Sequence, residues 1–515
     1  MKIAIVQQNY TVGDFGKNAT KISKAIFDAR QQNADLVVFP EMSICGSFPK
    51  DLLKIEDFEE TTMQTLQRIA TESFGTAVLI GCPTYCEDEK ETKLYNSAIL
   101  IENGVITRRF NKKNLSLTES KYFLTDKEKN VFEWKNQKIA VCVGDDCPDN
   151  DEKITLAINI TCRRFKHKSK KDFKQFSDCH YPVLSVNQIG GNTDCIYEGN
   201  SFILNSEGKL IVNLPYFKED FFIFDTEKDY EPIDNQDVDT TALLHDALIL
   251  GIQDYFQKNG FKTATLGLSG GIDSAVVVAL AAEALGSENI RVLLLPSEYS
   301  TSHSITDAEG LAQNLSIQYD IVPIKDIYNT ALKSLSPLFG DMPFSVAEEN
   351  LQARIRGLLL MAVSNKFGNI LLNTSNKSEV AVGYGTLYGD TNGSISVLGD
   401  VYKTDVFNLA RYINRDHEII PINTIIKPPS AELHPGQQDS DSLPDYDTLD
   451  KILFEYIENE KDENALLQMG FDKSIIEKTL RLVKRCEFKR VQLCPALAVS
   501  IKPFYEREIP LISKF

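Results

Sequence analysis

The chain has 515 residues, which at roughly 100 to 200 residues per domain corresponds to two or three domains and excludes a single small binding module. Its composition, with 43% hydrophobic and 25% charged residues, is that of an ordinary globular protein and excludes disorder over most of the chain. A formal charge of −18 opposes binding to nucleic acids and to anionic membrane surfaces, so we expect small molecules and proteins as partners.

The N-terminus and the cysteines indicate a cellular compartment. The first ten residues, MKIAIVQQNY, turn polar too early for a signal peptide, and no later run approaches the roughly 18 apolar residues that span a bilayer. The 10 cysteines are scattered, without a C-x-x-C pair or a histidine cluster that would suggest zinc. We therefore predict a cytoplasmic protein with mostly buried, reduced thiols.

The first half of the chain alternates β-rich runs with a helical pattern. Asn103-Gly104, between two β-rich runs in 97–110, is a strong hairpin signal. The remaining expected elements are a helix at 18–32 and strands at 2–9, 35–41, 76–83, 138–143 and 154–160. This mixture of open-sheet and antiparallel features predicts an α/β sandwich with helices outside.

An acidic segment between Thr226 and Thr240, nearly free of aliphatic residues, is the best domain boundary. We therefore predict domains at 1–235 and 236–515. After the boundary, a periodic helix at 242–260 precedes a strand, glycine turn and helix at 263–286 and a strand at 290–296. This order predicts a doubly wound α/β domain with a parallel sheet.

The glycine turn in the second domain has the sequence Ser269-Gly-Gly-Ile-Asp-Ser274. Glycines allow a tight turn that brings backbone N–H groups against phosphate, at the positive end of the following helix. No lysine follows the last glycine, so it is not a Walker loop. The segment resembles the signature of the ATP pyrophosphatase superfamily, whose members cleave ATP between the α- and β-phosphates. The resemblance implies ATP binding by Gly267, Ser269, Gly270, Gly271, Asp273 and Ser274.

Five later segments occur in the order typical of the NAD⁺ synthetase family. They are NLQARIR from Asn350, TSNKSE from Thr374, GYGTLYGD from Gly383, LGDVYK from Leu398 and PSAEL from Pro429. Together with the glycine turn, this resemblance covers most of 242–515. It implies ATP contacts for Thr374, Lys403 and Ser430, and deamido-NAD⁺ contacts for Asn350, Arg354, Glu379 and Lys489.

The resemblance also implies a reaction. The nicotinate carboxylate attacks the α-phosphate of ATP, and ammonia then attacks the acyl adenylate to give NAD⁺ and AMP. The implied cofactor is Mg²⁺, held by Asp273 and Glu379. Such synthetases assemble through this domain, which implies at least a dimer. One departure is Val499, which occupies the position of the family's C-terminal lysine, and the nearby Lys502 does not simply inherit that role.

The first 235 residues resemble the nitrilase superfamily, as does the glutaminase half of glutamine-dependent NAD⁺ synthetases. That superfamily uses a glutamate base, a lysine that stabilises the oxyanion and a cysteine nucleophile. Glu41 in VVFPEMSICG matches the base, Lys112 matches the lysine, and Glu119 matches a second, supporting glutamate.

The nucleophile of this pattern is missing. The segment KIAVCVGDD at 138–146 aligns with the pattern K-I-x-V-x-I-C-E-D and has Gly144 at the position of the cysteine. Cys142 lies two residues earlier, and a shift of two residues along a strand moves a sulfur by about 7 Å, beyond attacking distance. Cys147, three residues after Gly144, is no easier a substitute.

Two further departures affect the same domain. Arg163 stands where the pattern has a small hydroxyl residue that binds glutamine, and the stretch after Leu115 is four residues short. We therefore expect a degenerate amidase scaffold, nitrogen supplied by free ammonia, and little glutamine-dependent synthesis. The alternative is a fully glutamine-dependent NAD⁺ synthetase in which Cys142 is the nucleophile.

Other interpretations are weaker. GMP and asparagine synthetases also form amides through an adenylate, but they lack the segments at 374–379 and 383–390. A nucleotide-binding regulatory protein would not need the pyrophosphate-leaving apparatus of Asp273, Glu379 and Lys403. The basic run at 163–174 is interpreted as a solvated face, because the molecule as a whole is acidic.

Overall fold

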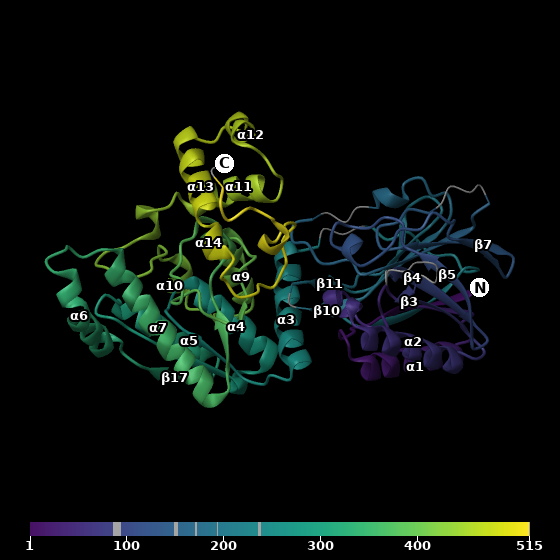
Figure 1. Cartoon of the computed structure of the whole chain (residues 1–515), viewed down its shortest axis with the longest axis horizontal. Helices are drawn as coiled ribbons and strands as arrows, with labels where there is room; N and C mark the ends of the chain where they lie inside the picture. Colours follow the sequence, from purple (N-terminus) through teal and green to yellow (C-terminus); the bar gives the residue numbers. More distant parts are fainter. Residues whose placement is uncertain (86–93, 149–152, 170–172, 193, 235–237, 514–515) are drawn as a thin grey trace. The chain divides into compact units, whose positions relative to one another are not determined.

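The computed structural model describes residues 1–85, 94–148, 153–169, 173–192, 194–234 and 238–513, and it consists of two compact units (Figure 1). The first unit comprises Met1–Phe165, Lys170–Asn192 and Tyr197–Asp237, and the second comprises Val238–Phe515 together with Lys166–Ser169 and Thr193–Ile196. The domain boundary predicted between 235 and 236 lies outside the described residues.

The first unit contains two six-stranded sheets. The first has the order β14-β1-β2-β3-β4-β5, and its strands are β1 (Lys2–Gln7), β2 (Leu36–Val38), β3 (Ala77–Tyr85), β4 (Leu94–Glu102), β5 (Val105–Asn111) and β14 (Asp220–Asp225). The second has the order β13-β12-β9-β8-β7-β6, and its strands are β6 (Val131–Trp134), β7 (Gln137–Val143), β8 (Leu156–Thr161), β9 (Val183–Asn187), β12 (Phe202–Leu204) and β13 (Leu210–Asn213). A short ribbon pairs β10 (Ile189–Gly191) with β11 (Ile196–Glu198).

The predicted sandwich is confirmed. Side chains from both sheets, such as Ile5 and Ile158, form one buried apolar cluster between them. Helices α1 (Phe15–Gln31) and α2 (Glu56–Glu72) lie side by side against the outer face of the first sheet (Figure 1). The hairpin at Asn103-Gly104 joins β4 to β5, and both residues have the positive φ, 50° and 81°, that a type I′ turn requires.

The second unit is built on the predicted parallel sheet, which is also confirmed. All strand pairs are parallel, in the order β17-β16-β15-β18-β19. The strands are β15 (Ala264–Gly267), β16 (Ile290–Leu294), β17 (Gln318–Ile321), β18 (Ile370–Asn373) and β19 (Ile395–Ser396). The carboxyl ends of β15 and β18 therefore meet at one edge of the sheet, where α/β proteins bind their ligands.

Helices enclose this sheet and extend beyond it. They are α3 (Thr240–Asn259), α4 (Ile272–Leu285), α5 (Ser302–Asn314), α6 (Lys325–Phe339), α7 (Val346–Phe367), α8 (Lys377–Val382), α9 (Lys403–Ile413), α10 (Ile422–Ile426), α11 (Tyr446–Ile457), α12 (Glu463–Gln468), α13 (Lys473–Arg485) and α14 (Glu487–Arg490). Helices α3, α4 and α9 pack against one another, whereas α6 and α7 pack on residues of β16. Within the described part of the chain, no helix has the length and apolar character needed to cross a membrane.

A buried charge network joins α8 to the C-terminal region. The Lys377 side chain is fully buried, and its Nζ donates to Glu458 Oε1 (2.5 Å) and Ser500 Oγ (2.6 Å) and pairs with Asp400 Oδ1 at 2.9 Å. Lys377 belongs to one of the quoted family segments, but these contacts give it a structural role, because a buried ammonium needs paired carboxylates.

Stability of the second unit is expected to depend on His245. Its ring lies between Asp246 Oδ1 (3.0 Å) and Glu283 Oε2 (3.1 Å), which join α3 to α4. Burial lowers the pKa of His245, but the two carboxylates outweigh burial and raise that pKa to about 9. The stabilisation is therefore fully present below pH 6.5 and is lost as the pH rises through 9.

Both carboxylates are about half exposed, so we expect only about 1 kcal/mol from this pairing. The thermal unfolding midpoint of Glu283→Gln should fall below that of the wild type by more at pH 6 than at pH 9.5. Equal shifts at both pH values would contradict the assignment.

Candidate active sites

The predicted phosphate-binding turn connects β15 to α4. Gly270 has a φ of +78°, and a Cβ at this position would lie 2.2 Å from the Ser304 carbonyl oxygen, so only glycine fits. Ser269 Oγ accepts from Gly271 N (3.1 Å) and lies 3.1 Å from Ser274 Oγ. The turn therefore places hydroxyls and backbone amides together at the N-terminus of α4, where the helix dipole attracts anions.

A buried lysine joins two carboxylates beside this turn. Lys403 Nζ lies 2.5 Å from Asp273 Oδ2 and 3.3 Å from Glu379 Oε1. Burial lowers the pKa of Lys403, but these two carboxylates outweigh burial and the net pKa is raised. Burial and the charge of Asp273 raise the pKa of Glu379. Asn376 Nδ2 donates to Asp273 Oδ1 (2.8 Å) and fixes its orientation.

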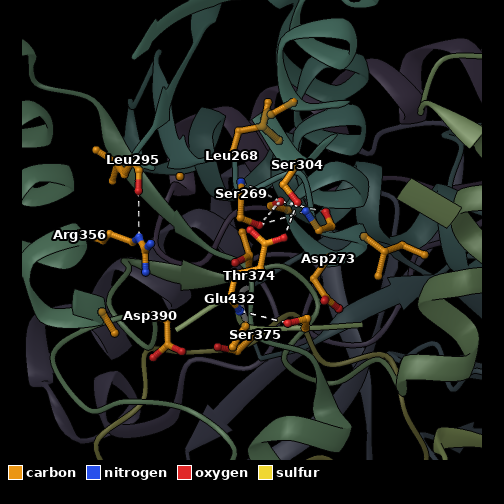
Figure 2. Close-up of a pocket in the computed structure, with 18 of the residues that line it drawn as sticks. Leu268, Ser269, Asp273, Leu295, Ser304, Arg356, Thr374, Ser375, Asp390 and Glu432 are labelled. Atoms are coloured by element: carbon orange, nitrogen blue, oxygen red, sulfur yellow. Dashed lines mark hydrogen bonds between the residues drawn. The ribbon is translucent and has the colours of Figure 1, made fainter. Parts of the chain in front are cut away.

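The turn and the lysine cluster line one cavity of about 310 Å³. In Figure 2, Ser269 and Thr374 lie between Asp273 on one side and Arg356 on the other. Of the predicted ATP-binding residues, all but Gly270 line this cavity: Gly267, Ser269, Gly271, Asp273, Ser274, Thr374, Lys403 and Ser430. Glu379, predicted for the dinucleotide and the metal, lines the same cavity.

The other predicted deamido-NAD⁺ residues lie outside that lining and hold one neighbouring loop. Arg354 Nε donates to the Leu387 carbonyl (3.2 Å), and Asn350 Oδ1 accepts from the Thr386 hydroxyl (2.7 Å). Lys489 Nζ donates to the carbonyl oxygens of Gly383 and Gly385, both at 2.8 Å. The three residues thus converge on the segment 383–390, which was quoted for its family resemblance.

Five further charged residues line the cavity without a predicted role, and Arg356 and Glu432 are two of them. Arg356 donates from Nε to the Leu295 carbonyl (3.0 Å), and burial lowers its pKa. Glu432 accepts from the Ser304 hydroxyl (2.7 Å) and the Thr301 hydroxyl (2.9 Å), near the start of α5 (Figure 2). Both belong to quoted segments, NLQARIR and PSAEL, so an inward position could have been proposed for each.

The first unit contains a second polar cluster around Glu41. This buried carboxylate accepts from Asn96 Nδ2 (2.5 Å) and pairs with Lys112 Nζ at 3.1 Å. Lys112 Nζ also lies 2.6 Å from Glu119 Oε1. Burial lowers the pKa of Lys112, but the two glutamates outweigh burial and keep it raised. The predicted base, lysine and supporting glutamate therefore lie in contact.

Gly144 adjoins the same cluster. The residue follows β7 with a φ of +62°, and a Cβ there would lie 2.3 Å from Lys112 Nζ and 3.4 Å from Glu41 Oε2. Cys142, the candidate nucleophile, is fully buried in β7. Among the described residues, the hydrogen-bond partners of Glu41 are Asn96, Lys112 and Cys162, and Cys142 is not one of them. Cys147 is exposed.

Sequence reasoning missed the thiol that does contact Glu41. Cys162 follows β8, and its Sγ lies 3.0 Å from Glu41 Oε2. Its backbone N–H donates to the same oxygen at 3.1 Å. Burial raises the pKa of this thiol, and the charge of Glu41 raises it further. The signal was present, because strands at 138–143 and 154–160 were both predicted and a cysteine follows the second of them.

Comparison with known proteins gives matches to both units. A family model described as NAD synthase matches residues 244–493, and one described as carbon-nitrogen hydrolase matches residues 2–157, a match that ends before Cys162. The glutamine-dependent NAD(+) synthetase of Synechocystis sp. is 42% identical over 98% of this chain and 96% of its own length.

Solved structures agree with these matches. The glutamine-dependent NAD⁺ synthetase of Acinetobacter baumannii, in complex with ADP, has a TM-score of 0.78 and 34% identity over 99% of this chain and 98% of its own. That of Cytophaga hutchinsonii has a TM-score of 0.84 and 21% identity over 100% and 98%, which shows a shared fold. The names of these relatives do not support the predicted loss of glutamine use.

Proposed function

Because the chain belongs to the family of two-domain glutamine-dependent NAD⁺ synthetases, we propose that it amidates deamido-NAD⁺ to NAD⁺, converting ATP to AMP and pyrophosphate. It is a carbon–nitrogen ligase by that membership. The observation that carries the proposal is the cavity of the second unit, where the glycine turn meets the Asp273–Lys403–Glu379 cluster. Purified protein given ATP, deamido-NAD⁺ and ammonium should form NAD⁺ and AMP in equal amounts. Formation of ADP, or turnover without deamido-NAD⁺, would contradict the proposal.

The turn is suited to hold the leaving pyrophosphate. Its backbone amides and the hydroxyls of Ser269 and Ser274 lie at the positive end of α4, so they can stabilise negative charge that grows as the α–β phosphate bond breaks. Lys403 is a buried cation that adjoins this turn through its pair with Asp273. The two carboxylates outweigh burial and raise the pKa of Lys403, so its side chain carries a positive charge beside the turn.

We propose Mg²⁺ as the cofactor, with Asp273 and Glu379 as its protein ligands. Asp273 and Glu379 line the same cavity as the glycine turn, and this fits the way Mg²⁺ is bound, by one or two carboxylates together with substrate phosphates. When bound, the ion would neutralise phosphate charge. Lys403 occupies the space between the carboxylates and supplies the positive charge there.

For the dinucleotide, we propose that Asn350, Arg354 and Lys489 act together with the loop at 383–390. All three form hydrogen bonds with that loop. Arg354 is exposed on α7, so its guanidinium is accessible to the anionic dinucleotide. The loop adjoins the cavity through Tyr384, which is part of its lining.

Arg354→Ala is expected to weaken deamido-NAD⁺ far more than ATP, because a charge-assisted contact to an anionic ligand contributes about 1.5–3 kcal/mol. Steady-state titration of each substrate at saturation of the other measures the difference. Arg481→Ala, which removes another exposed arginine outside the cavity lining, is the matched control. Equal losses for both substrates would show that Arg354 does not bind the dinucleotide.

We propose glutamine as the nitrogen donor, with ammonia released in the first unit. The relatives carry glutamine dependence in their names, and the cluster of Glu41, Lys112 and Glu119 retains a base and an oxyanion-stabilising cation in contact. Glutamate release that accompanies NAD⁺ formation, in equal amounts, tests this proposal. NAD⁺ formation with ammonium but not with glutamine would contradict it.

We also propose at least a dimer through the second unit. Its helices α6 and α7 and the segment between them expose large apolar side chains, among them Leu338 (77% exposed), Val346 (64%) and Leu358 (63%). Exposed large apolar residues that lie together mark interaction surfaces in other proteins, and these residues are the candidates for such a surface here. Sedimentation of the Leu338→Asp/Leu358→Asp variant should show a smaller species than the wild type. A monomeric wild type would exclude the proposal.

A further inference from the structure

We propose that Cys162 is the nucleophile that hydrolyses glutamine in the first unit, in place of the side chain that Gly144 lacks. This inference rests on the proposed use of glutamine as nitrogen donor. The two positions meet one and the same atom: Cys162 Sγ lies 3.0 Å from Glu41 Oε2, and a Cβ on Gly144 would lie 3.4 Å from it. A thiol is therefore present at the base although the aligned position has none.

The topology explains how a neighbouring strand supplies it. Strands β7 and β8 are adjacent and parallel, with Val143 paired to Ile160, so Gly144 and Cys162 follow strand ends at the same edge of the sheet. The distance between neighbouring strands is about 4.8 Å, which one side chain can bridge. Hydrogen bonds lock the two ends together, from Gly144 N to Ile160 O (2.8 Å) and from Asn159 Nδ2 to Gly144 O (2.9 Å).

The space at position 144 is filled by the lysine. Since a Cβ there would lie 2.3 Å from Lys112 Nζ and 2.6 Å from its Cε, a cysteine at 144 would have to displace the cation. Asp146 fixes the chain beside that lysine, because its carboxylate accepts from the backbone N–H of Lys113 (2.9 Å) and of Asn114 (2.7 Å). A side chain at position 144 would therefore clash with Lys112, whereas the thiol of Cys162 contacts Glu41 without such a clash.

A buried amide supplies an independent indication of a ligand. Asn96 is 1% exposed, and its Nδ2 donates to Glu41 Oε1 at 2.5 Å. Its Oδ1 is buried and accepts no hydrogen bond from the described residues. A buried acceptor without a donor is costly, and a primary carboxamide brings two N–H donors. Glutamine therefore fits the polar groups of this site.

The chemistry needs only groups in contact with one another and water. As the sulfur of Cys162 attacks the amide carbon of glutamine, its proton passes to Glu41, and the carbonyl electron pair moves to oxygen beside Lys112. The C–N bond then breaks, the proton on Glu41 passes to nitrogen, and ammonia leaves a thioester on Cys162. Water attacks the thioester as Glu41 takes its proton, the C–S bond breaks, that proton returns to sulfur, and glutamate is released.

The experiment compares Cys162→Ala and Cys162→Ser with Cys147→Ala, which removes an exposed thiol as the matched control. Each full-length protein is incubated with 6-diazo-5-oxo-L-norleucine, a glutamine analogue that alkylates a nucleophilic thiol, and its intact mass and modified peptide are measured. Glutamate release and NAD⁺ formation are then measured with glutamine and, separately, with ammonium. The ammonium reaction belongs to the cavity of the second unit and reports whether each variant is folded.

We expect one adduct on Cys162 in the wild type and in Cys147→Ala. Both Cys162 variants should form no adduct and lose at least 100-fold in glutamine-dependent synthesis, on the order of what a reacting group contributes. An adduct on Cys142 or Cys147, or glutamine use that survives in both Cys162 variants, would overturn the inference. So would a wild type that forms NAD⁺ from ammonium but neither reacts with the analogue nor releases glutamate. A wild type without ammonium-dependent synthesis would instead overturn the proposed ligase function.

Discussion

Asp273→Asn is expected to lower NAD⁺ formation from ATP, deamido-NAD⁺ and ammonium by about 100- to 1,000-fold, the loss typical of one electrostatic group in an active site. Asp273 lies in the first turn of α4 beside the glycine turn, pairs with Lys403 at 2.5 Å and is a proposed ligand of Mg²⁺. Asparagine preserves the size of the side chain and removes the charge. The Lys403 cation then has only Glu379 as a carboxylate partner, and the proposed Mg²⁺ site retains only one of its two carboxylates.

The control for this variant is Asp472→Asn. Asp472 also stands at a helix start, where it caps α13 by accepting from Ser474 N (2.8 Å), but it lies outside the cavity lining. The initial rate at saturating substrates, with circular dichroism to verify the fold, separates the two variants. Near wild-type turnover in folded Asp273→Asn would exclude the proposed role of this carboxylate.

The strands and the glycine turn could be predicted because their signals are local. Runs such as KIAVCV at 138–143 are buried on both faces and read as strands, and Asn103-Gly104 provides the positive φ of a hairpin. Helix α2 was not predicted. Its buried face includes Glu59, Thr62 and Thr65 among apolar residues. Because glutamate and threonine are mostly exposed in proteins, these positions do not read as part of a buried face.

The site of the second unit was predictable as a set of residues but not as a geometry. The quoted segments contain the residues that line the cavity, yet their order in the sequence does not separate Arg356, which lines it, from Arg354, which holds a loop beside it. The two arginines are two residues apart on α7 and therefore face different directions. Only the packing of the helix shows which one faces the cavity.

In the first unit the predicted nucleophile position, Gly144, lacks a thiol, and the two cysteines considered as substitutes, Cys142 and Cys147, are close to it in the sequence. The thiol that contacts Glu41 follows the neighbouring strand β8 and is 18 residues from Gly144 in the sequence. The two residues lie close together because adjacent parallel strands bring their ends to one edge of the sheet. A side chain that is missing after one strand can thus be supplied by a residue after the adjacent strand. A motif aligned along a single stretch of sequence does not detect such a replacement.

Glu41→Gln is expected to lower glutamine-dependent NAD⁺ formation by about 100- to 10,000-fold, the contribution typical of a general base, while the reaction with ammonium continues. The carboxylate is 1% exposed and contacts Lys112 and the Cys162 thiol at 3.1 and 3.0 Å. A glutamine side chain at position 41 has the same shape as glutamate, but its amide cannot take the thiol proton.

The control is Glu59→Gln, which changes a different buried glutamate, on α2, and should leave both reactions intact. Because the two nitrogen donors are assayed on one preparation, equal losses with both donors would mean that Glu41 acts on the fold and not on glutamine hydrolysis. An unchanged rate with glutamine would mean that the base lies elsewhere.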